Sequence, residues 1–228
     1  MTAATPRSKL KVLIIEDHAL FAESLELALT VEGYAVESLP LKESATTQAV
    51  LTAVSRIRPH IVLLDIDLHG VGDGVRLITP MVKAGIQVVV VTASTDRARW
   101  GECLRYGARK VLSKSQQLNE ILSTVRRINQ GFPVMSREER DELINHWHEQ
   151  GLERVALQRR LALLTPREET VLGELMRGRT VRDISASSFV AEATVRTQVK
   201  AILAKLEVSS QLAAVGLANA AAWHPPNG

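Results

Sequence analysis

Short apolar runs alternate with helix-like segments five times between residues 10 and 130. The runs are rich in Val, Ile and Leu and cover residues 10–15, 34–39, 60–65, 86–92 and 108–114. The segments that follow them place apolar residues at helical spacing, at 18–31, 44–57, 75–84, 95–106 and 116–130. Because each strand is followed by a helix, the strands should run parallel with helices on both faces. The sequence therefore predicts a doubly wound α/β domain with a five-stranded parallel sheet.

The first of these helices has apolar residues at positions that suit a helix packed on a sheet. We expect the following positions to pack on the sheet: Leu20, Phe21, Leu25, Leu27, Ala28 and Val31.

Polar side chains stand where four of the predicted strands end. Glu16 and Asp17 follow the first strand, Asp65 follows the third, Thr92 ends the fourth and Lys114 ends the fifth. The carboxyl ends of parallel strands meet at one edge of a sheet, where such sheets bind their ligands. Clustered carboxylates repel one another unless a cation is present, and Mg²⁺ prefers oxygen ligands. These side chains therefore predict an acyl-phosphate site with Mg²⁺, in which Asp65 is the nucleophile.

Thr92 and Lys114 have separate predicted roles at this site. The Lys114 amine would pair with a phosphoryl oxygen as a point charge, and the Thr92 hydroxyl would donate a hydrogen bond to another oxygen.

Residues 133–163 are dense in charges of both signs and predict a linker helix that opens with a capping box at Ser136 and Glu139. Gly151 should weaken this helix by roughly 1 kcal/mol relative to Ala. Two interpretations stay open, a solvated linker or a helix that pairs between subunits. The apolar residues available for packing are Leu143, Trp147, Leu152, Val155 and Leu163.

From Thr165 onward the pattern is helical throughout, with capping boxes at Thr165 with Glu168 and at Thr180 with Asp183. Helices are expected at about 165–177, from 180, at 193–206 and at about 210–222. The helix at 193–206 has three basic side chains and no acidic one. Its core-facing residues are expected to be Val195, Val199, Ile202 and Leu206, and its exposed polar residues Thr194, Arg196, Thr197 and Lys200. Arginine and lysine on one helix face suit the major groove of DNA, but an amphipathic helix with solvated cations would show the same pattern, so both interpretations stay open at this point.

Composition is typical of a globular protein and does not indicate a disulfide-bonded, membrane or secreted one. Hydrophobic residues make up 46% and charged residues 23%, as in ordinary globular proteins. The single Cys103 allows no internal disulfide, no apolar run approaches the ~20 residues of a membrane span, and no signal peptide is visible. We therefore expect a cytoplasmic protein without a membrane segment. Residues 161–228 carry seven basic and six acidic side chains, 7 − 6 = +1, so net charge alone would not indicate DNA binding.

The motifs together resemble a known family. The ED pair at 16–17, LLDIDL, VVVVTA and VLSK are similar to a two-component receiver domain with a flavodoxin-like fold, and LTPREE with ATVRTQVKAILAKLEVSS resembles a LuxR-type helix-turn-helix. The chain thus resembles a response regulator of the NarL/FixJ class. The resemblance implies a receiver domain at 1–131, a linker at 132–163 and a four-helix DNA-binding domain at 164–228.

The same resemblance implies roles for particular residues and partners. A sensor histidine kinase would phosphorylate Asp65, with Mg²⁺ held by Glu16, Asp17, Asp65 and the backbone carbonyl of Asp67. The phosphorylated protein would form a homodimer that binds operator DNA through Thr194, Arg196, Thr197 and Lys200, and it would not be an enzyme in the usual sense.

The chain departs from the family pattern at several positions. His69 and Ser115 stand where Pro is usual, and Val111 occupies the place of a switch aromatic, usually Tyr or Phe. Ala191 replaces a capping Ser or Thr, and Glu207 replaces a customary Gly. Because the small, stiff valine offers little difference between two packing states, weak coupling between phosphorylation and output is expected.

Two alternatives remain. The first is a DNA-binding regulator that does not depend on phosphorylation. The second is a phosphatase of the haloacid dehalogenase type, in which Asp65 would be the nucleophile and Asp67 the general acid. In those enzymes the acidic metal pair follows the nucleophile, whereas Glu16 and Asp17 precede it here.

Overall fold

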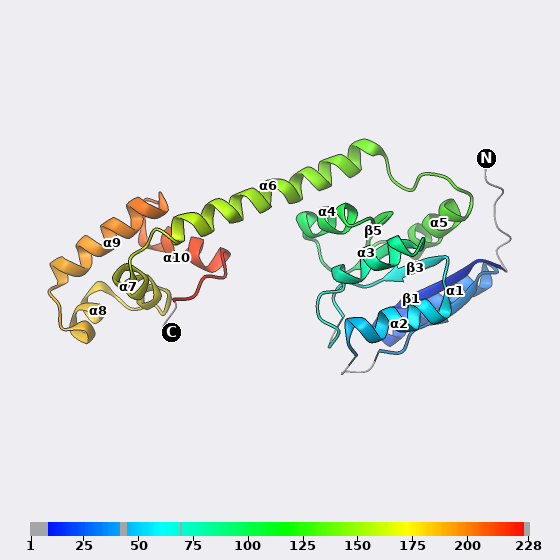
Figure 1. Ribbon diagram of the computed structural model, residues 1–228, viewed down its shortest axis with the longest axis horizontal. Coiled ribbons are helices and arrows are strands. Elements are labelled where there is room, and N and C mark those ends of the chain that lie inside the picture. Colours follow the sequence, from blue (N-terminus) through cyan, green and yellow to red (C-terminus); the bar gives the residue numbers. More distant parts are fainter. Residues whose placement is uncertain (1–8, 42–44, 69, 226–228) are drawn as a thin grey trace. The chain divides into compact units, whose positions relative to one another are not determined.

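Five parallel strands pair in the order β2-β1-β3-β4-β5 in the computed structural model, which describes residues 9–41, 45–68 and 70–225 (Figure 1). The strands are β1 (Lys11–Ile15), β2 (Ala35–Ser38), β3 (Ile61–Leu64), β4 (Gln87–Thr92) and β5 (Lys110–Ser113). The helices between and after them are α1 (Ala19–Val31), α2 (Thr47–Ile57), α3 (Val75–Lys83), α4 (Arg97–Arg105) and α5 (Leu118–Asn129). The predicted doubly wound parallel sheet is confirmed. This sheet belongs to the first of two units, Met1–His148 and Glu149–Gly228.

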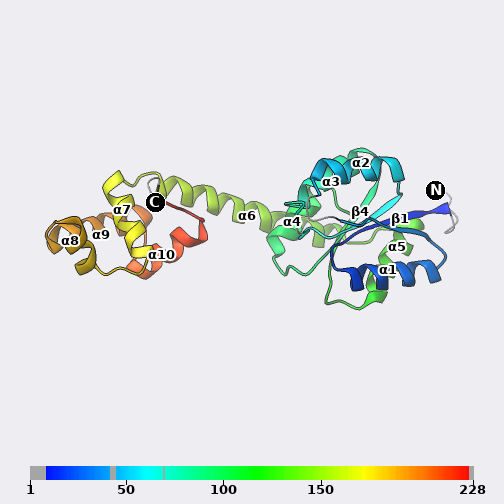
Figure 2. The same ribbon diagram turned by 90° about the horizontal axis from the view of Figure 1, so that it is seen from below.

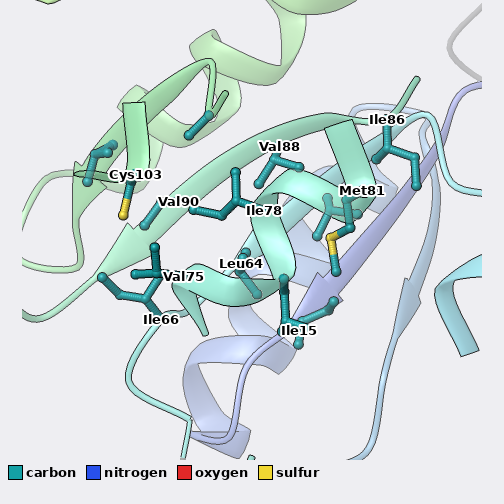
Figure 3. Close-up of a cluster of buried hydrophobic side chains, with 14 of the residues drawn as sticks. Ile15, Leu64, Ile66, Val75, Ile78, Met81, Ile86, Val88, Val90 and Cys103 are labelled. Carbon is teal, nitrogen blue, oxygen red and sulfur yellow. The ribbon is translucent and has the colours of Figure 1, made fainter. Parts of the chain in front are cut away.

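Helices cover both faces of the sheet (Figure 2). On one face, α1 and α5 pack against alternate strand residues such as Ile14, Leu63 and Val89. On the other face, α2, α3 and α4 enclose a core in which Ile78 and Met81 point toward residues of β1, β3 and β4 (Figure 3). Because β3 is buried on both faces, its run of four apolar residues shows no polar alternation.

The packing of α1 differs from the prediction at three positions. Leu25 and Leu29 are buried against the sheet, whereas Leu20, Leu27 and Val31 are 81%, 68% and 80% exposed. Residues 25 and 29 lie one turn apart on the face toward the sheet, and residues 20, 27 and 31 lie on the opposite side of the helix. The apolar composition of the segment therefore predicted the helix but not which face is buried.

The helix α6 (Arg137–Leu161) begins in the first unit and ends in the second. Ser136 accepts a hydrogen bond from the backbone of Glu139, which is half of the predicted capping box. In the first unit, Leu143 is buried in the core on the side of α4, and Trp147 meets Tyr106 edge to face. Most of α6 is exposed, including Leu152 and Val155 at 72% and 45%, as the interpretation as a solvated linker predicts, and the exception in the first unit is the packed face around Leu143. Pairing between subunits stays a prediction.

The second unit holds α7 (Pro166–Met176), α8 (Val181–Ser188), α9 (Glu192–Leu206) and α10 (Gln211–Ala220) around one apolar core. Both predicted capping boxes are present, at Thr165 and Thr180. The N-cap of α9 is Ala191, so the helix begins one residue earlier than predicted and includes Glu192.

No single described helix is both long and apolar enough to cross a membrane. Taken together, α9 and α10 pass a test of length and composition, but they are bent by 53° at the break between them.

Candidate functional site

The predicted acidic residues come together where β1 and β3 end. These strands are neighbours, and the strand order reverses between them, which is where sheets of this topology bind ligands. The Glu16 and Asp65 side chains are 3% and 1% exposed, and that of Asp17 is 14% exposed. One potential ligand atom from each of these acids and from His18 lies within 4.8 Å of the others.

Lys114 lies among these acids as predicted. Its Nζ donates to Asp65 Oδ2 at 2.6 Å and to Glu16 Oε1 at 2.8 Å, and it lies 5.4 Å from the centre of the Phe21 ring. Burial of the ammonium by itself would lower the pKa of Lys114, but the hydrogen bonds and charges of Asp65 and Glu16 outweigh it and raise the pKa above its usual value. The lysine is therefore held charged beside the carboxylate of Asp65.

Thr92 is buried at the end of β4, and its hydroxyl donates to Asp67 Oδ2 at 2.8 Å. The backbone N–H of Asp67 in turn donates to Asp65 Oδ1 at 3.0 Å. The three residues therefore form one hydrogen-bonded group, with Thr92 bound to Asp67 in this state.

The donor set fits a hard divalent cation. Glu16, Asp17 and Asp65 supply carboxylate oxygens, and the Lys114 ammonium beside them balances only part of their negative charge. Mg²⁺ prefers oxygen ligands and completes its shell with water, so these residues suit it. The role of the Asp67 carbonyl as a further ligand stays a prediction.

Sequence reasoning missed two residues at this site. The ring of His18 lies 3.0 Å from Glu16 Oε1 and 2.9 Å from Asp17 Oδ1, and its place directly after the acidic pair could have marked it. Arg99 of α4 reaches Asp73 at 3.1 Å and Asp67 at 3.5 Å. Nothing in the sequence marks Arg99, because its partners lie on a distant loop.

The structure describes two of the receiver residues that depart from the family pattern, Val111 and Ser115. Val111 is 4% exposed in the core shared with α3 and α4. The hydroxyls of Ser113 and Ser115 lie 2.8 Å apart beside Lys114. His69 lies outside the described residues.

In the second unit, α9 presents Thr194, Arg196, Thr197 and Lys200 on its exposed side. Its residues Val195, Val199, Ile202 and Leu206 are buried in the core, as predicted. Arg196 pairs with the newly included Glu192 at 3.2 Å, so α9 is not free of acidic side chains.

Lys205 of the same helix is differently placed from Arg196 and Lys200. It donates to Glu168 at 2.6 Å, and Glu168 also caps α7. Burial by itself would raise the pKa of Glu168, but the Lys205 ammonium and the Thr165 donors outweigh it and lower the pKa. Lys205 therefore serves the core of the unit rather than its exposed face.

Comparisons with known proteins agree with both parts of the chain. The model of the response regulator receiver domain matches residues 12–126, and that of the bacterial regulatory proteins of the luxR family matches residues 162–218. A nitrate/nitrite response regulator protein homolog of Haemophilus influenzae is 26% identical over 213 residues, covering 92% of this chain and 97% of the relative. The transcriptional regulatory protein DegU of Brevibacillus brevis is 25% identical over 228 residues, covering 94% of this chain and 95% of DegU.

A solved structure shows the same fold. The crystal structure of a LuxR-family two-component response regulator from an Aurantimonas species has a TM-score of 0.50 and 19% identity, covering 60% of this chain and 96% of its own. The matched models, the parallel sheet with its acidic site and the helical second unit lead to one conclusion. The chain belongs to the response regulators, in which a receiver domain is joined to a LuxR-family DNA-binding domain.

Proposed function

We propose that the protein is switched by phosphorylation of Asp65 in the presence of Mg²⁺ and then binds operator DNA as a homodimer. A sensor histidine kinase would be the phosphoryl donor, and the cytoplasm the place of action. The receiver would occupy residues 1–131, the linker 132–163 and the DNA-binding domain 164–228. The observation that carries the proposal is the buried Asp65 carboxylate, held between Lys114 and the acidic residues of β1.

In the proposed transfer, an Asp65 oxygen attacks phosphorus and the new O–P bond forms, while the donor's P–N bond breaks and leaves its electron pair on the histidine nitrogen of the kinase. One Asp65 oxygen is held by the backbone of Asp67, whereas the other, among the residues that the structure describes, is held only by the flexible Lys114 side chain. Lys114 can therefore follow the transferred group and pair with one of its oxygens. The Thr92 hydroxyl would supply a second donor.

Mg²⁺ held by Glu16, Asp17 and Asp65 would neutralise charge on the incoming phosphoryl group. The ammonium of Lys114 supplies one more positive charge. Because Asp65 is consumed and regenerated once per signal, the protein acts as a stoichiometric acceptor.

Incubation with acetyl phosphate and Mg²⁺, followed by intact mass, tests this assignment. We expect the mass of one phosphoryl group on the wild type and none on Asp65→Asn. Asp67→Asn, which keeps the backbone carbonyl, is the matched control and should still be labelled. Full labelling of Asp65→Asn would refute the assignment. Steady phosphate release that is lost in Asp67→Asn would instead indicate a phosphatase.

The DNA-binding part of the proposal rests on α9. Arg196 and Lys200 are exposed on the side opposite its buried stripe, and Thr194 and Thr197 lie beside them. Arginine can read guanine in the major groove, and lysine can contact bases or phosphates. DNA could compete with Glu192 for Arg196, because the pair is exposed and therefore weak. If the unphosphorylated protein bound its operator as tightly as the phosphorylated one, the protein would be a phosphorylation-independent regulator.

A further inference from the structure

A chain of polar contacts leads from Thr92 to α4. The Thr92 hydroxyl donates to Asp67 Oδ2, and the other oxygen of the same carboxylate lies 3.5 Å from Arg99 Nη2. That Nη2 also lies 3.1 Å from Asp73 Oδ1. Arg99 Nε is buried and has no acceptor within the part of the chain that the structure describes. The guanidinium therefore has the capacity to bind a carboxylate more fully than it does here.

Phosphorylation creates a conflict in this group. The proposed function, on which this inference rests, assigns the Thr92 hydroxyl to a phosphoryl oxygen. A hydroxyl has a single proton, so it cannot donate to Asp67 and to the phosphoryl group at once. Asp67 would lose the shorter of its two side-chain hydrogen bonds just as a more negative group appears beside it, and like charges at this range repel.

We propose that Arg99 is a positioning residue that takes over the Asp67 carboxylate from Thr92 when Asp65 is phosphorylated. The carboxylate needs only a small shift, because Arg99 is already 3.5 Å away and a charge-assisted hydrogen bond is shorter. The exchange leaves each group with a partner: Thr92 with the phosphoryl oxygen, and Asp67 with Arg99. It also ties the state of the site to α4, the helix that carries Arg99.

The proposal predicts effects of opposite direction on metal binding and on phosphorylation. Removing the Arg99 charge makes the site more negative, so Mg²⁺ should bind as tightly as before or more tightly. The same change disfavours the approach of the anionic phosphoryl donor. Without Arg99, the Asp67 carboxylate also has no arginine to move to, so it keeps the hydrogen bond of Thr92. Labelling should therefore slow down. Damage to the fold of the site would instead weaken both metal binding and labelling.

The experiment compares the rate of labelling by acetyl phosphate at saturating Mg²⁺ with the Mg²⁺ dissociation constant from calorimetry. We expect Arg99→Ala to label about fivefold more slowly, the upper end of the effect of a partly exposed charge. Arg99→Lys should recover most of the rate, because it restores the charge. Arg105→Ala removes the same charge from an exposed position at the other end of α4 and should label like the wild type.

A double-mutant cycle with Asp67→Asn identifies the partner through which Arg99 acts. In that background Arg99→Ala should change the rate less than about twofold, since the substitution leaves a neutral amide in place of the carboxylate that Arg99 would receive. An undiminished effect would overturn the proposal and point to Asp73. A wild-type rate in Arg99→Ala, or weaker Mg²⁺ binding together with a lower Tm, would also overturn it. Absence of label on the wild type would refute the proposed function itself, and this inference with it.

Discussion

Gly101→Ala tests the contact between α4 and the first part of α6. A methyl group at Gly101 would overlap the carbonyl oxygen of Leu143 and lie 2.7 Å from its carbonyl carbon and 3.0 Å from Trp147 Cβ. Because the main obstacle is helix backbone rather than a rotatable side chain, α6 must move away from α4. In a helix without this neighbour, the same substitution would stabilise by about 1 kcal/mol. The sign of the effect therefore reports whether α6 is packed on α4.

The size of the effect follows from what α6 contributes there. Leu143 is 4% exposed, and full burial of a leucine is worth about 1.5–3 kcal/mol. Trp147 adds an edge-to-face contact with Tyr106, worth about 0.5–1.5 kcal/mol. Arg140 donates to two main-chain carbonyl groups, at about 1 kcal/mol each. If about half of this is lost and the gain in helix propensity offsets part of it, the first unit is destabilised by about 1–2 kcal/mol, or about 3–6 °C in Tm.

The assay is thermal unfolding of the full chain in a Trp223→Phe background, where the fluorescence of Trp100 and Trp147 follows the first unit. Gly151→Ala is the matched control, because it adds the same methyl group to α6 where nothing described lies within 4 Å. Because Gly151 lies in the second unit, this control should favour the helix by about 1 kcal/mol and leave the Tm of the first unit unchanged. A Tm of the first unit that is unchanged or higher in Gly101→Ala would refute the packing of α6 on α4.

Four further predictions concern single residues. Phe189 ends α8 at φ 54° and is 96% exposed, so Phe189→Gly should relieve strain and stabilise the second unit by about 1 kcal/mol in thermal unfolding, and a lower Tm would contradict this. Folding lowers the pKa of Glu168, so its carboxylate contributes to the free energy of unfolding above the unfolded-state pKa, and this contribution is lost as pH falls through the folded-state pKa. In Glu168→Gln the free energy of unfolding should therefore fall less steeply as the pH is lowered. Arg196→Ala should weaken binding to the specific operator by about 1–3 kcal/mol. Lys200→Ala should weaken binding to all DNA sequences and reduce the slope of log K against log salt concentration by about 1. Unchanged binding titrations for both variants would mean that α9 is not the recognition helix. Beryllofluoride, a phosphoryl mimic, should raise operator affinity only toward the low end of the ~5–150-fold range of allosteric systems, and by more in Val111→Tyr; a gain above about a hundredfold in the wild type would show that Val111 does not blunt the switch.

The residues of the acidic site were predictable because they depend on short-range pattern and simple topology. Asp65 and Thr92 each stand at the end of a run of branched apolar residues, and parallel strands bring such ends together. Lys114 follows from the same rule on β5. The capping box at Thr165 was equally readable, since it joins residues three apart on one turn.

Contacts that depend on how elements pack could not be read in this way. Arg99 is separated from Asp67 and Asp73 by 32 and 26 residues, and only the folded sheet brings α4 beside their loop. Leu20 and Leu27 carry the same apolar signal as Leu25, but only the seating of α1 on the sheet decides which of them is buried. Periodicity identifies a helix, whereas tertiary contact selects its buried face.

Within the first unit, α4 lies between the loop after β3 and the first part of α6. Arg99 faces the loop after β3, and two residues further on Gly101 lies against α6. A rise of about 1.5 Å per residue puts these two positions about 3 Å apart along α4, so the exchange proposed for Arg99 would take place less than one helical turn from the contact with α6. The same α6 continues to Leu161, which is buried in the core of the second unit. If Arg99 also carried part of the signal, Arg99→Ala would reduce the beryllofluoride effect on operator affinity in both the wild type and Val111→Tyr.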